Sequence, residues 1–199
     1  AMVRFVSQLQ ERFDAAPSPP LLSAAVVRGL EAGVAALKDA GAATLPSSAA
    51  VEEPGFRFPN TVLATSGERF LEKPDELQTE CFGPVSLAVT RTDAEQRLAI
   101  SRLLHGQLTA TIYSDTNGAD DEEYGPLAAI LRRKAGRLLN DKMPTGVAVV
   151  PSMNHGGPFP ASGHPHFTAV GIPAALTRFT RLACYDGVRE PRLPAALRG

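Results

Sequence analysis

The sequence has 199 residues, 44% of them hydrophobic and 21% charged, which is ordinary for a globular protein with one substantial core. Its formal net charge of -1 argues against nucleic acid or an anionic membrane as the main partner, because both require a basic surface. No apolar run approaches the roughly 18 residues that a membrane-spanning helix requires, so no membrane partner is expected.

Two amphipathic helices are predicted at the start of the chain. Apolar residues recur at helical spacing over residues 3–14, and the proline-rich stretch at 17–20 ends this helix. Ser23 is a suitable N-cap for a second helix that extends to about Lys38, and Gly41 supplies the stop after it. The first residues carry charges where a signal peptide needs an apolar stretch, so no targeting segment is expected.

Strands and helices alternate through the middle of the chain. Strands are predicted near residues 56–65, as a buried strand in "PVSLAVTRT", in "QLTATIYSD" and, briefly, in "GRLLN". Thr92 and Glu95 resemble a capping box that opens a helix over about 93–104. Another helix in "NGADDEEYGPLAAILRRKAG" has acidic opening turns and a basic last turn, and Gly136 is expected to end it. This alternation predicts an α/β fold with an open, mostly parallel sheet and flanking helices.

The last third of the chain has a different composition. Residues 141–173 are rich in glycine and proline, and long ordered loops of this kind on α/β scaffolds are usually functional. Residues 174–188 predict a helical turn and a last strand, and the tail that follows predicts an extended arm. We therefore expect two units, a main domain at 1–178 and a strand with its arm at 179–199.

The two cysteines, Cys81 and Cys184, are too few for a disulfide framework and lack metal-ligand spacing. Both have apolar neighbours, so we expect buried free thiols in a reducing cytoplasm. A nucleophilic couple of Cys81 with His155 is an alternative. Against it, Glu80 next to the thiol would disfavour the thiolate by like-charge repulsion.

The histidines indicate no metal site and one candidate for ligand binding. His164 and His166 have no carboxylate or thiol nearby in the sequence, and His105 is expected to cap the C-terminus of a helix. His155 precedes two glycines, which either let a ligand approach the backbone closely or form a simple tight turn. No glycine-rich phosphate-binding motif occurs in the sequence.

Glu80 and Phe82 flank the first cysteine in "ECFGPV". Glu80 is either a solvated carboxylate at the end of a helix or a ligand for a ribose diol, because a carboxylate can accept two hydrogen bonds at once. Phe82 could pack on a planar ring.

This segment resembles the Glu-aliphatic-Phe-Gly-Pro-Val signature of the NAD(P)-dependent aldehyde dehydrogenases. "QLTATIYS", "AGRLLND" and "HGGPFPASG" resemble further segments of that family, in the same order. From residue 154 onward the sequence is similar to one branch, the 2,5-dioxopentanoate (α-ketoglutarate semialdehyde) dehydrogenases and NADP-using long-chain relatives. The resemblance covers at least residues 77–190.

The resemblance implies a role for four residues of this chain. Glu80 would hold the nicotinamide ribose hydroxyls of NAD or NADP, and Phe82 would pack beside the nicotinamide. Asn154 and His155 match the wall of the aldehyde tunnel, where the wider family has an aromatic in place of the imidazole. The last strand would join a sheet shared between subunits, which implies a homo-oligomer.

The departure from the family concerns catalysis. Its nucleophilic cysteine, general-base glutamate and dinucleotide-binding domain all precede the Glu80 motif, and no "GQxC" segment occurs here. The chain therefore resembles the C-terminal part of the catalytic domain, without a catalytic residue of its own. We expect it to be inactive alone and, in a whole enzyme, to serve the oxidation of an aldehyde or oxo-acid semialdehyde. The alternative is a non-catalytic assembly or scaffold module.

Overall fold

The first two helices form where the sequence predicts them. The computed structural model, which describes residues 2–46, 54–146, 148 and 150–199, has helix α1 at Met2–Ala15 and helix α2 at Ala24–Asp39. The hydroxyl of Ser23 caps α2 by accepting a hydrogen bond from the backbone N–H of Val26. Gly41 follows the end of α2 with a φ of +109°, a conformation that favours glycine, so the predicted stop is confirmed.

The strands form two small sheets. The first has the order β1-β2-β3, with β1 at Ala43–Thr44, β2 at Thr61–Ser66 and β3 at Val85–Thr90. Strand β1 is antiparallel to β2, and β2 is parallel to β3. The second sheet is the parallel pair of β4 at Gln107–Ile112 and β5 at Ala135–Asn140.

The parallel pairing that the alternation predicts is thus confirmed, and in the described residues it is divided between two small sheets. Each parallel pair is a separate βαβ unit with its own crossover, and no ladder joins β3 to β4 in this part of the chain. Strand β3 lies at the edge of its sheet with a neighbouring strand on one side only. Its residues are therefore half-buried along their whole length, where a buried strand was expected.

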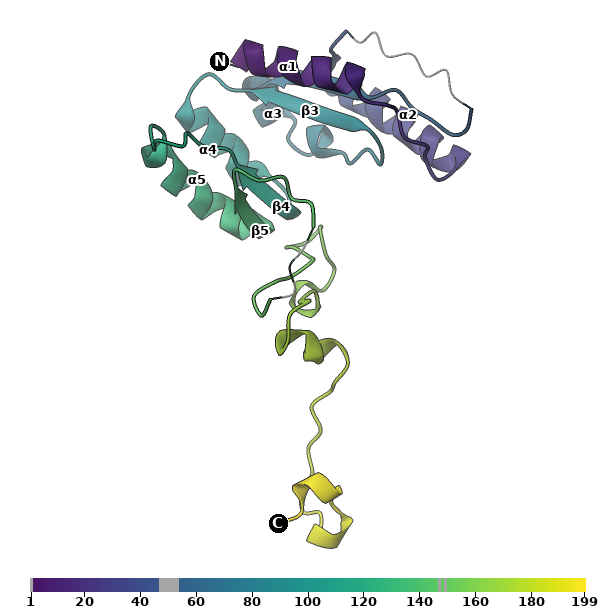
Figure 1. Cartoon of the computed structure of the whole chain (residues 1–199), viewed down its shortest axis with the longest axis vertical. Coiled ribbons are helices and arrows are strands. Elements are labelled where there is room, and N and C mark those ends of the chain that lie inside the picture. The colour runs from purple at the N-terminus through teal and green to yellow at the C-terminus, as the bar shows by residue number, and fades with distance from the viewer. Residues whose placement is uncertain (1, 47–53, 147, 149) are drawn as a thin grey trace.

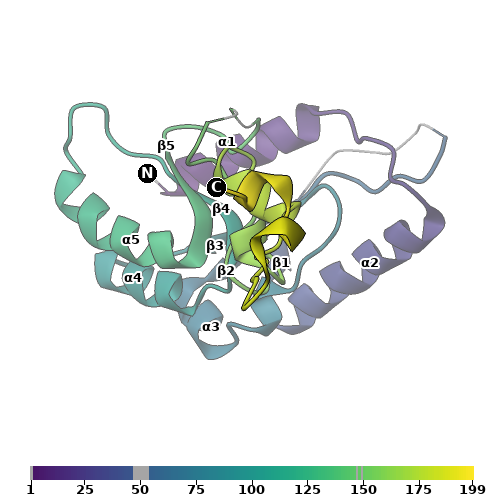
Figure 2. The same ribbon diagram turned by 90° about the horizontal axis from the view of Figure 1, so that it is seen from below.

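Helices pack on both faces of the first sheet (Figure 2). Helix α1 lies on one side of β2 and β3, while α2 and α3, at Gly67–Glu72, lie on the other. Helix α5 at Asp121–Lys134 packs on the second sheet, and α4 at Ala94–Leu103 lies between α5 and α3. The two cores contain mainly aliphatic side chains: Leu37, Ala40, Ala42, Leu63, Phe70 and Leu77 in the first, Ile112, Leu127, Ala128 and Leu131 in the second.

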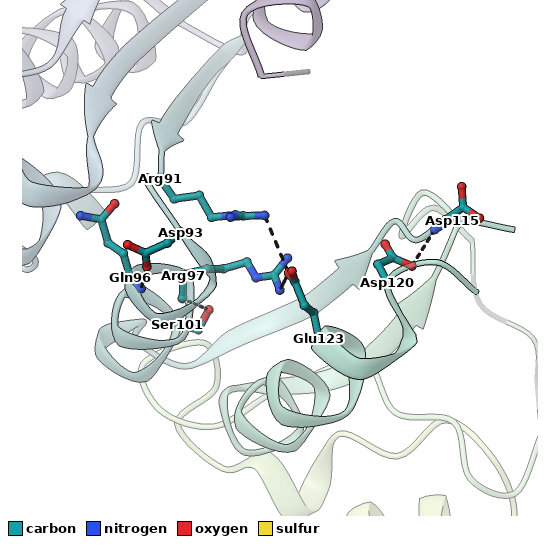
Figure 3. A network of polar contacts seen from close by, with 8 residues as sticks. All are labelled: Arg91, Asp93, Gln96, Arg97, Ser101, Asp115, Asp120 and Glu123. Carbon is teal, nitrogen blue, oxygen red and sulfur yellow. Dashed lines mark hydrogen bonds and ion pairs between the residues drawn. The ribbon is translucent and has the colours of Figure 1, made fainter. Parts of the chain in front are cut away.

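Polar contacts join α4 to α5 at the ends where both helices begin (Figure 3). Arg97 of α4 forms an ion pair with Glu123 of α5, and the guanidinium of Arg91 lies 3.8 Å from the same carboxylate. The N-cap of α4 is Asp93, not Thr92 as predicted. Its carboxylate accepts a 2.8 Å hydrogen bond from the N–H of Gln96, whose side chain in turn accepts one from the N–H of Thr92. The cap lies one residue later than expected, because aspartate is as good a cap as threonine, and the return hydrogen bond comes from the residue just before the cap.

After β5, part of the glycine-rich loop lies against β4 and β5, and the chain beyond this loop extends away from the body that holds the two sheets (Figure 1). Short 3₁₀ turns at Pro165–Phe167 and Ala174–Arg178 are the regular elements near its start. Among the described helices, none combines the length and apolar composition that a bilayer crossing requires.

The last strand predicted within residues 174–188 does not form. A segment becomes a strand only when it pairs with another edge, and in the described chain this segment pairs with none. The tail was expected to be an extended arm, and within it the structure has 3₁₀ turns at Glu190–Arg192 and Ala195–Leu197. Cys184 is exposed, because nothing packs on its segment, so the prediction of a buried thiol is wrong there. The division of the chain at residue 178 stays a prediction.

Candidate functional site

The Glu80 turn connects the 3₁₀ turn at Glu76–Gln78 to β3. Gly83 anchors it, because a Cβ at this position would lie 2.4 Å from a methyl carbon of the buried Leu30 in α2. The carbonyl of Pro84 then accepts a 2.8 Å hydrogen bond from the N–H of Thr61, which ties the turn to β2.

The two side chains predicted to bind the cofactor both lie on the outside of this turn. Glu80 is exposed, and 71% of Phe82 is accessible to solvent. A carboxylate and an aromatic ring two residues apart on an anchored turn can contact a diol and the planar ring attached to it. The structure therefore leaves both groups accessible for the role that the sequence predicts.

Cys81 points the other way, toward α2. A Cβ placed on Gly33 would lie 2.8 Å from its Sγ, so the thiol fills the space that this glycine leaves open. Burial raises the pKa of the Cys81 thiol, and the neighbouring Glu80 carboxylate raises it further. Within the described residues no hydrogen bond joins Cys81 to His155, so the thiol–imidazole couple does not form.

Iodoacetamide is expected to label the exposed Cys184 several-fold faster than Cys81 at pH 7.5. The raised pKa lowers the thiolate fraction of Cys81, which is the reacting species, so its rate should still be rising at pH 9. Peptide mass spectrometry over a time course at both pH values measures the two rates. Faster labelling of Cys81 at neutral pH would restore the thiol-enzyme hypothesis.

Asn154 holds the glycine-rich loop on β5. Its side-chain N–H donates a 3.0 Å hydrogen bond to the carbonyl of Gly136, and its backbone pairs with Ala169 across the loop. The same side chain accepts a hydrogen bond from the N–H of Gly156. Because its amide is engaged in this way, Asn154 positions the loop, and a direct contact with substrate stays a prediction.

The loop glycines allow one backbone to approach another. A Cβ on Gly136 would lie 1.6 Å from the carbonyl oxygen of Gly156, and one on Gly157 would lie 2.0 Å from that of Gln107. From the sequence, the two glycines after His155 were expected either to let a ligand approach the backbone or to form a tight turn. In the structure they instead let the loop backbone pack on the first residues of β4 and β5. Gly136 lies inside β5, and α5 passes directly into this strand. The prediction that Gly136 ends the helix is therefore wrong.

The imidazole of His155 is exposed beside a depression of about 130 Å³. Its backbone N–H donates a 2.8 Å hydrogen bond to the carbonyl of Thr168, which fixes the loop but leaves the ring available. Arg137 of β5 lines the same depression. Sequence reasoning missed Arg137; the signal was a lone cation inside a short, otherwise apolar strand.

The remaining histidines have structural partners. His105 lies beyond the end of α4 and does not cap it as predicted; its Nε2 is 2.8 Å from a carboxylate oxygen of Asp75. The rings of His164 and His166 both lie against Phe167. In the part of the chain that the structure describes, no three His, Cys, Asp or Glu side chains gather as a metal site requires.

No family model matches the chain, but curated proteins are similar to it in sequence, among them two semialdehyde dehydrogenases. An α-ketoglutaric semialdehyde dehydrogenase of Acinetobacter baylyi is 34% identical over 199 residues, which is 100% of this chain. α-Ketoglutaric semialdehyde dehydrogenase 2 of Azospirillum brasilense is 44% identical over 131 residues, or 65% of this chain. The chain spans only 37% and 24% of the lengths of these two relatives.

Solved structures with the same fold are aldehyde dehydrogenases. Lactaldehyde dehydrogenase from Escherichia coli matches with a TM-score of 0.58 and 24% identity, over 78% of this chain and 32% of that one. Betaine aldehyde dehydrogenase from Staphylococcus aureus, in complex with NAD+, matches with a TM-score of 0.60 and 17% identity, over 78% and 31%. At these identities the likeness concerns the fold, and it confirms the predicted α/β class.

Proposed function

The chain belongs to the aldehyde dehydrogenase family, and from this we propose that it is the C-terminal part of an enzyme that oxidises an aldehyde to a carboxylic acid with NAD or NADP. The observation that carries the proposal is the 34% identity along all 199 residues to a semialdehyde dehydrogenase. The ordered motifs from "ECFGPV" to "HGGPFPASG" support the same assignment.

Glu80 and Phe82 are proposed to bind the nicotinamide end of the cofactor. The exposed carboxylate can accept hydrogen bonds from both hydroxyls of a ribose, and the exposed ring can pack beside the nicotinamide. Anchoring of the turn by Gly83 holds these two groups on a rigid support, which reduces the entropy lost on binding. The cofactor, when bound, would accept the hydride of the oxidised aldehyde.

The substrate is proposed to be an oxo-acid semialdehyde. The depression beside His155 has an imidazole and the guanidinium of Arg137 on its walls, and together they can bind the carboxylate end of such a molecule. An alkyl aldehyde would offer neither group a negatively charged partner, whereas among the described residues the guanidinium of Arg137 now donates only to the carbonyl of Gly146. The names of the two relatives support this substrate class.

The thiol that forms the thioester would come from the rest of the enzyme. Neither cysteine of this chain suits that role, since the pKa of Cys81 is raised and Cys184 lies on a segment outside both sheets. We also propose that the enzyme is a homo-oligomer, because Phe179 and Leu182 are largely exposed and would be covered by a second subunit. A cytoplasmic location stays a prediction.

The 199-residue chain alone is expected to oxidise no aldehyde with NAD or NADP above the buffer rate. The reason is that it lacks a nucleophile, so adding the part that contains one should restore the reaction. We would sequence the DNA upstream of the Met2 codon and co-express any product with a glycine-rich nucleotide domain and a "GQxC"-like thiol. Activity is then measured as NAD(P)H absorbance with a semialdehyde.

The alternative function, a scaffold that only assembles, is favoured by the exposed apolar residues near the C-terminus, such as Leu182. It predicts oligomers on a sizing column but no oxidation after the second part is added. A monomeric chain that is active by itself would contradict both functions.

A further inference from the structure

A depression of about 590 Å³ lies where α4 and α5 end. The chain from Arg102 to Gly106 forms one wall, and Arg133 and Lys134 at the end of α5 form a second. Residues 158–160 of the glycine-rich loop form the third wall. A volume of this size is typical of sites for small organic ligands, which occupy roughly 300–1,000 Å³. We refer to this depression as the cationic pocket.

The cationic pocket holds three positive charges without counterions. Among the described residues, neither Arg102 nor Arg133 nor Lys134 forms an ion pair or a side-chain hydrogen bond. The opposite ends of the same helices differ, because Glu123 neutralises Arg97 there (Figure 3). Each helix C-terminus contributes roughly half a negative charge, which offsets only part of the three cations. The pocket therefore has an excess of positive charge.

The third wall of the cationic pocket is apolar and held in place. A Cβ on Gly106 would lie 2.0 Å from the carbonyl oxygen of Pro158, so this glycine lets the loop pack directly on the chain before β4. The ring of Phe159 is 79% exposed at this wall, and Leu103 of α4 is 42% exposed. An aromatic face in this setting can stack on a planar ligand.

His105 adds a polar side chain to the cationic pocket. The imidazole lines it, and its Nε2 is 2.8 Å from the carboxylate oxygen of Asp75. This contact fixes the orientation of the imidazole ring. The carboxylate of Asp75 offsets at most one of the three positive charges, so the excess in the pocket remains positive.

We propose that the cationic pocket binds a phosphate monoester with an aromatic body, of about the size of a nucleoside monophosphate. Such a phosphate carries about 1.5–2 negative charges at pH 7 and three acceptor oxygens, which match two guanidinium groups and an ammonium. The aromatic body would stack on Phe159. None of Glu80, Phe82, Asn154 and His155 lines this pocket, so its ligand is separate from the cofactor and aldehyde contacts proposed above.

The test is calorimetric titration of the 199-residue chain with AMP, adenosine and inorganic phosphate. AMP should bind more tightly than either fragment, because only AMP offers both the charge and the ring. Replacing Arg133→Glu together with Lys134→Glu should weaken AMP binding roughly 100-fold, about tenfold for each lost charged contact. The control is the double variant Arg28→Glu and Lys38→Glu on α2, which has the same change in net charge. It should change the affinity for AMP less than about twofold.

Phe159→Ala gives an independent measurement at an exposed position where folding is not at risk. It should weaken AMP binding several-fold and leave the affinity for inorganic phosphate unchanged. Adenosine binding as tightly as AMP, or equal losses in the α5 and α2 double variants, would overturn the proposal. Glu80→Gln should not alter AMP binding, so a failure of this site and a failure of the cofactor assignment are distinguishable.

Discussion

Gly136→Ala is expected to lower the free energy of unfolding by about 2–4 kcal/mol, because the new methyl group cannot be accommodated without moving the backbone. A Cβ at this position would lie 1.6 Å from the carbonyl oxygen of Gly156 and 2.9 Å from the side-chain oxygen of Asn154. Neither atom belongs to a flexible chain end, since the hydrogen bond from Asn154 to Gly136 holds the loop on β5. The loop must therefore leave the strand.

Urea denaturation followed by circular dichroism measures the loss, and limited proteolysis shows whether the loop has detached. The matched control is Gly29→Ala in α2, where a Cβ would meet nothing within 4 Å. Alanine favours a helix by about 0.5–1 kcal/mol over glycine, so this variant should be slightly more stable than the wild type. Equal stability of the two variants and an uncut loop would contradict the packing of residues 154–157 on the sheet.

Glu80→Gln and His155→Phe are expected to have separable effects in the complete enzyme. The glutamine keeps its size but loses the charge that strengthens two hydrogen bonds to a ribose, so KM for the nucleotide should rise roughly tenfold. Selectivity among aldehydes should not change. His155→Phe should instead shift kcat/KM about tenfold from oxo-acid semialdehydes toward alkyl aldehydes, with the nucleotide KM unaltered.

Each variant is the control for the other, because both side chains are exposed and belong to different segments. Steady-state kinetics with varied nucleotide and with paired aldehydes separates the two effects. If Glu80→Gln left the nucleotide KM unchanged, its carboxylate would be a solvated surface group, which was the other interpretation of this residue. If His155→Phe left the selectivity unchanged, the proposed contact with substrate would be wrong.

Local signals predicted the parts of the fold that depend on neighbouring residues. The Ser23 cap and the Gly41 stop bound α2 as expected, because a cap requires only a side chain within reach of the first N–H groups. The raised pKa of Cys81 also follows from the sequence, since the adjacent Glu80 is one of its causes. The errors of a single position, such as Thr92 for Asp93, arose where two adjacent residues could both cap.

Predictions that required distant partners were less successful. From its place in the sequence, His105 was expected to cap a helix, but its side chain contacts Asp75, which lies 30 residues away. Gly136 has the appearance of a helix stop, and only the position of Gly156 explains why glycine is needed there. The segment around Cys184 has the pattern of a strand, and a strand exists only when an edge is available to pair with it.

The sequence by itself determined the family, the α/β class, both ends of α2 and the candidate residues Glu80, Phe82, Asn154 and His155, because these depend on local patterns and ordered motifs. Only the tertiary structure decided that the strands divide into two sheets and that Asn154 supports the loop beside which His155 is exposed. It also decided that Arg102, Arg133 and Lys134 share one pocket. The physical reason is that pairing and charge clustering depend on contacts between segments far apart in the chain, which no local pattern encodes.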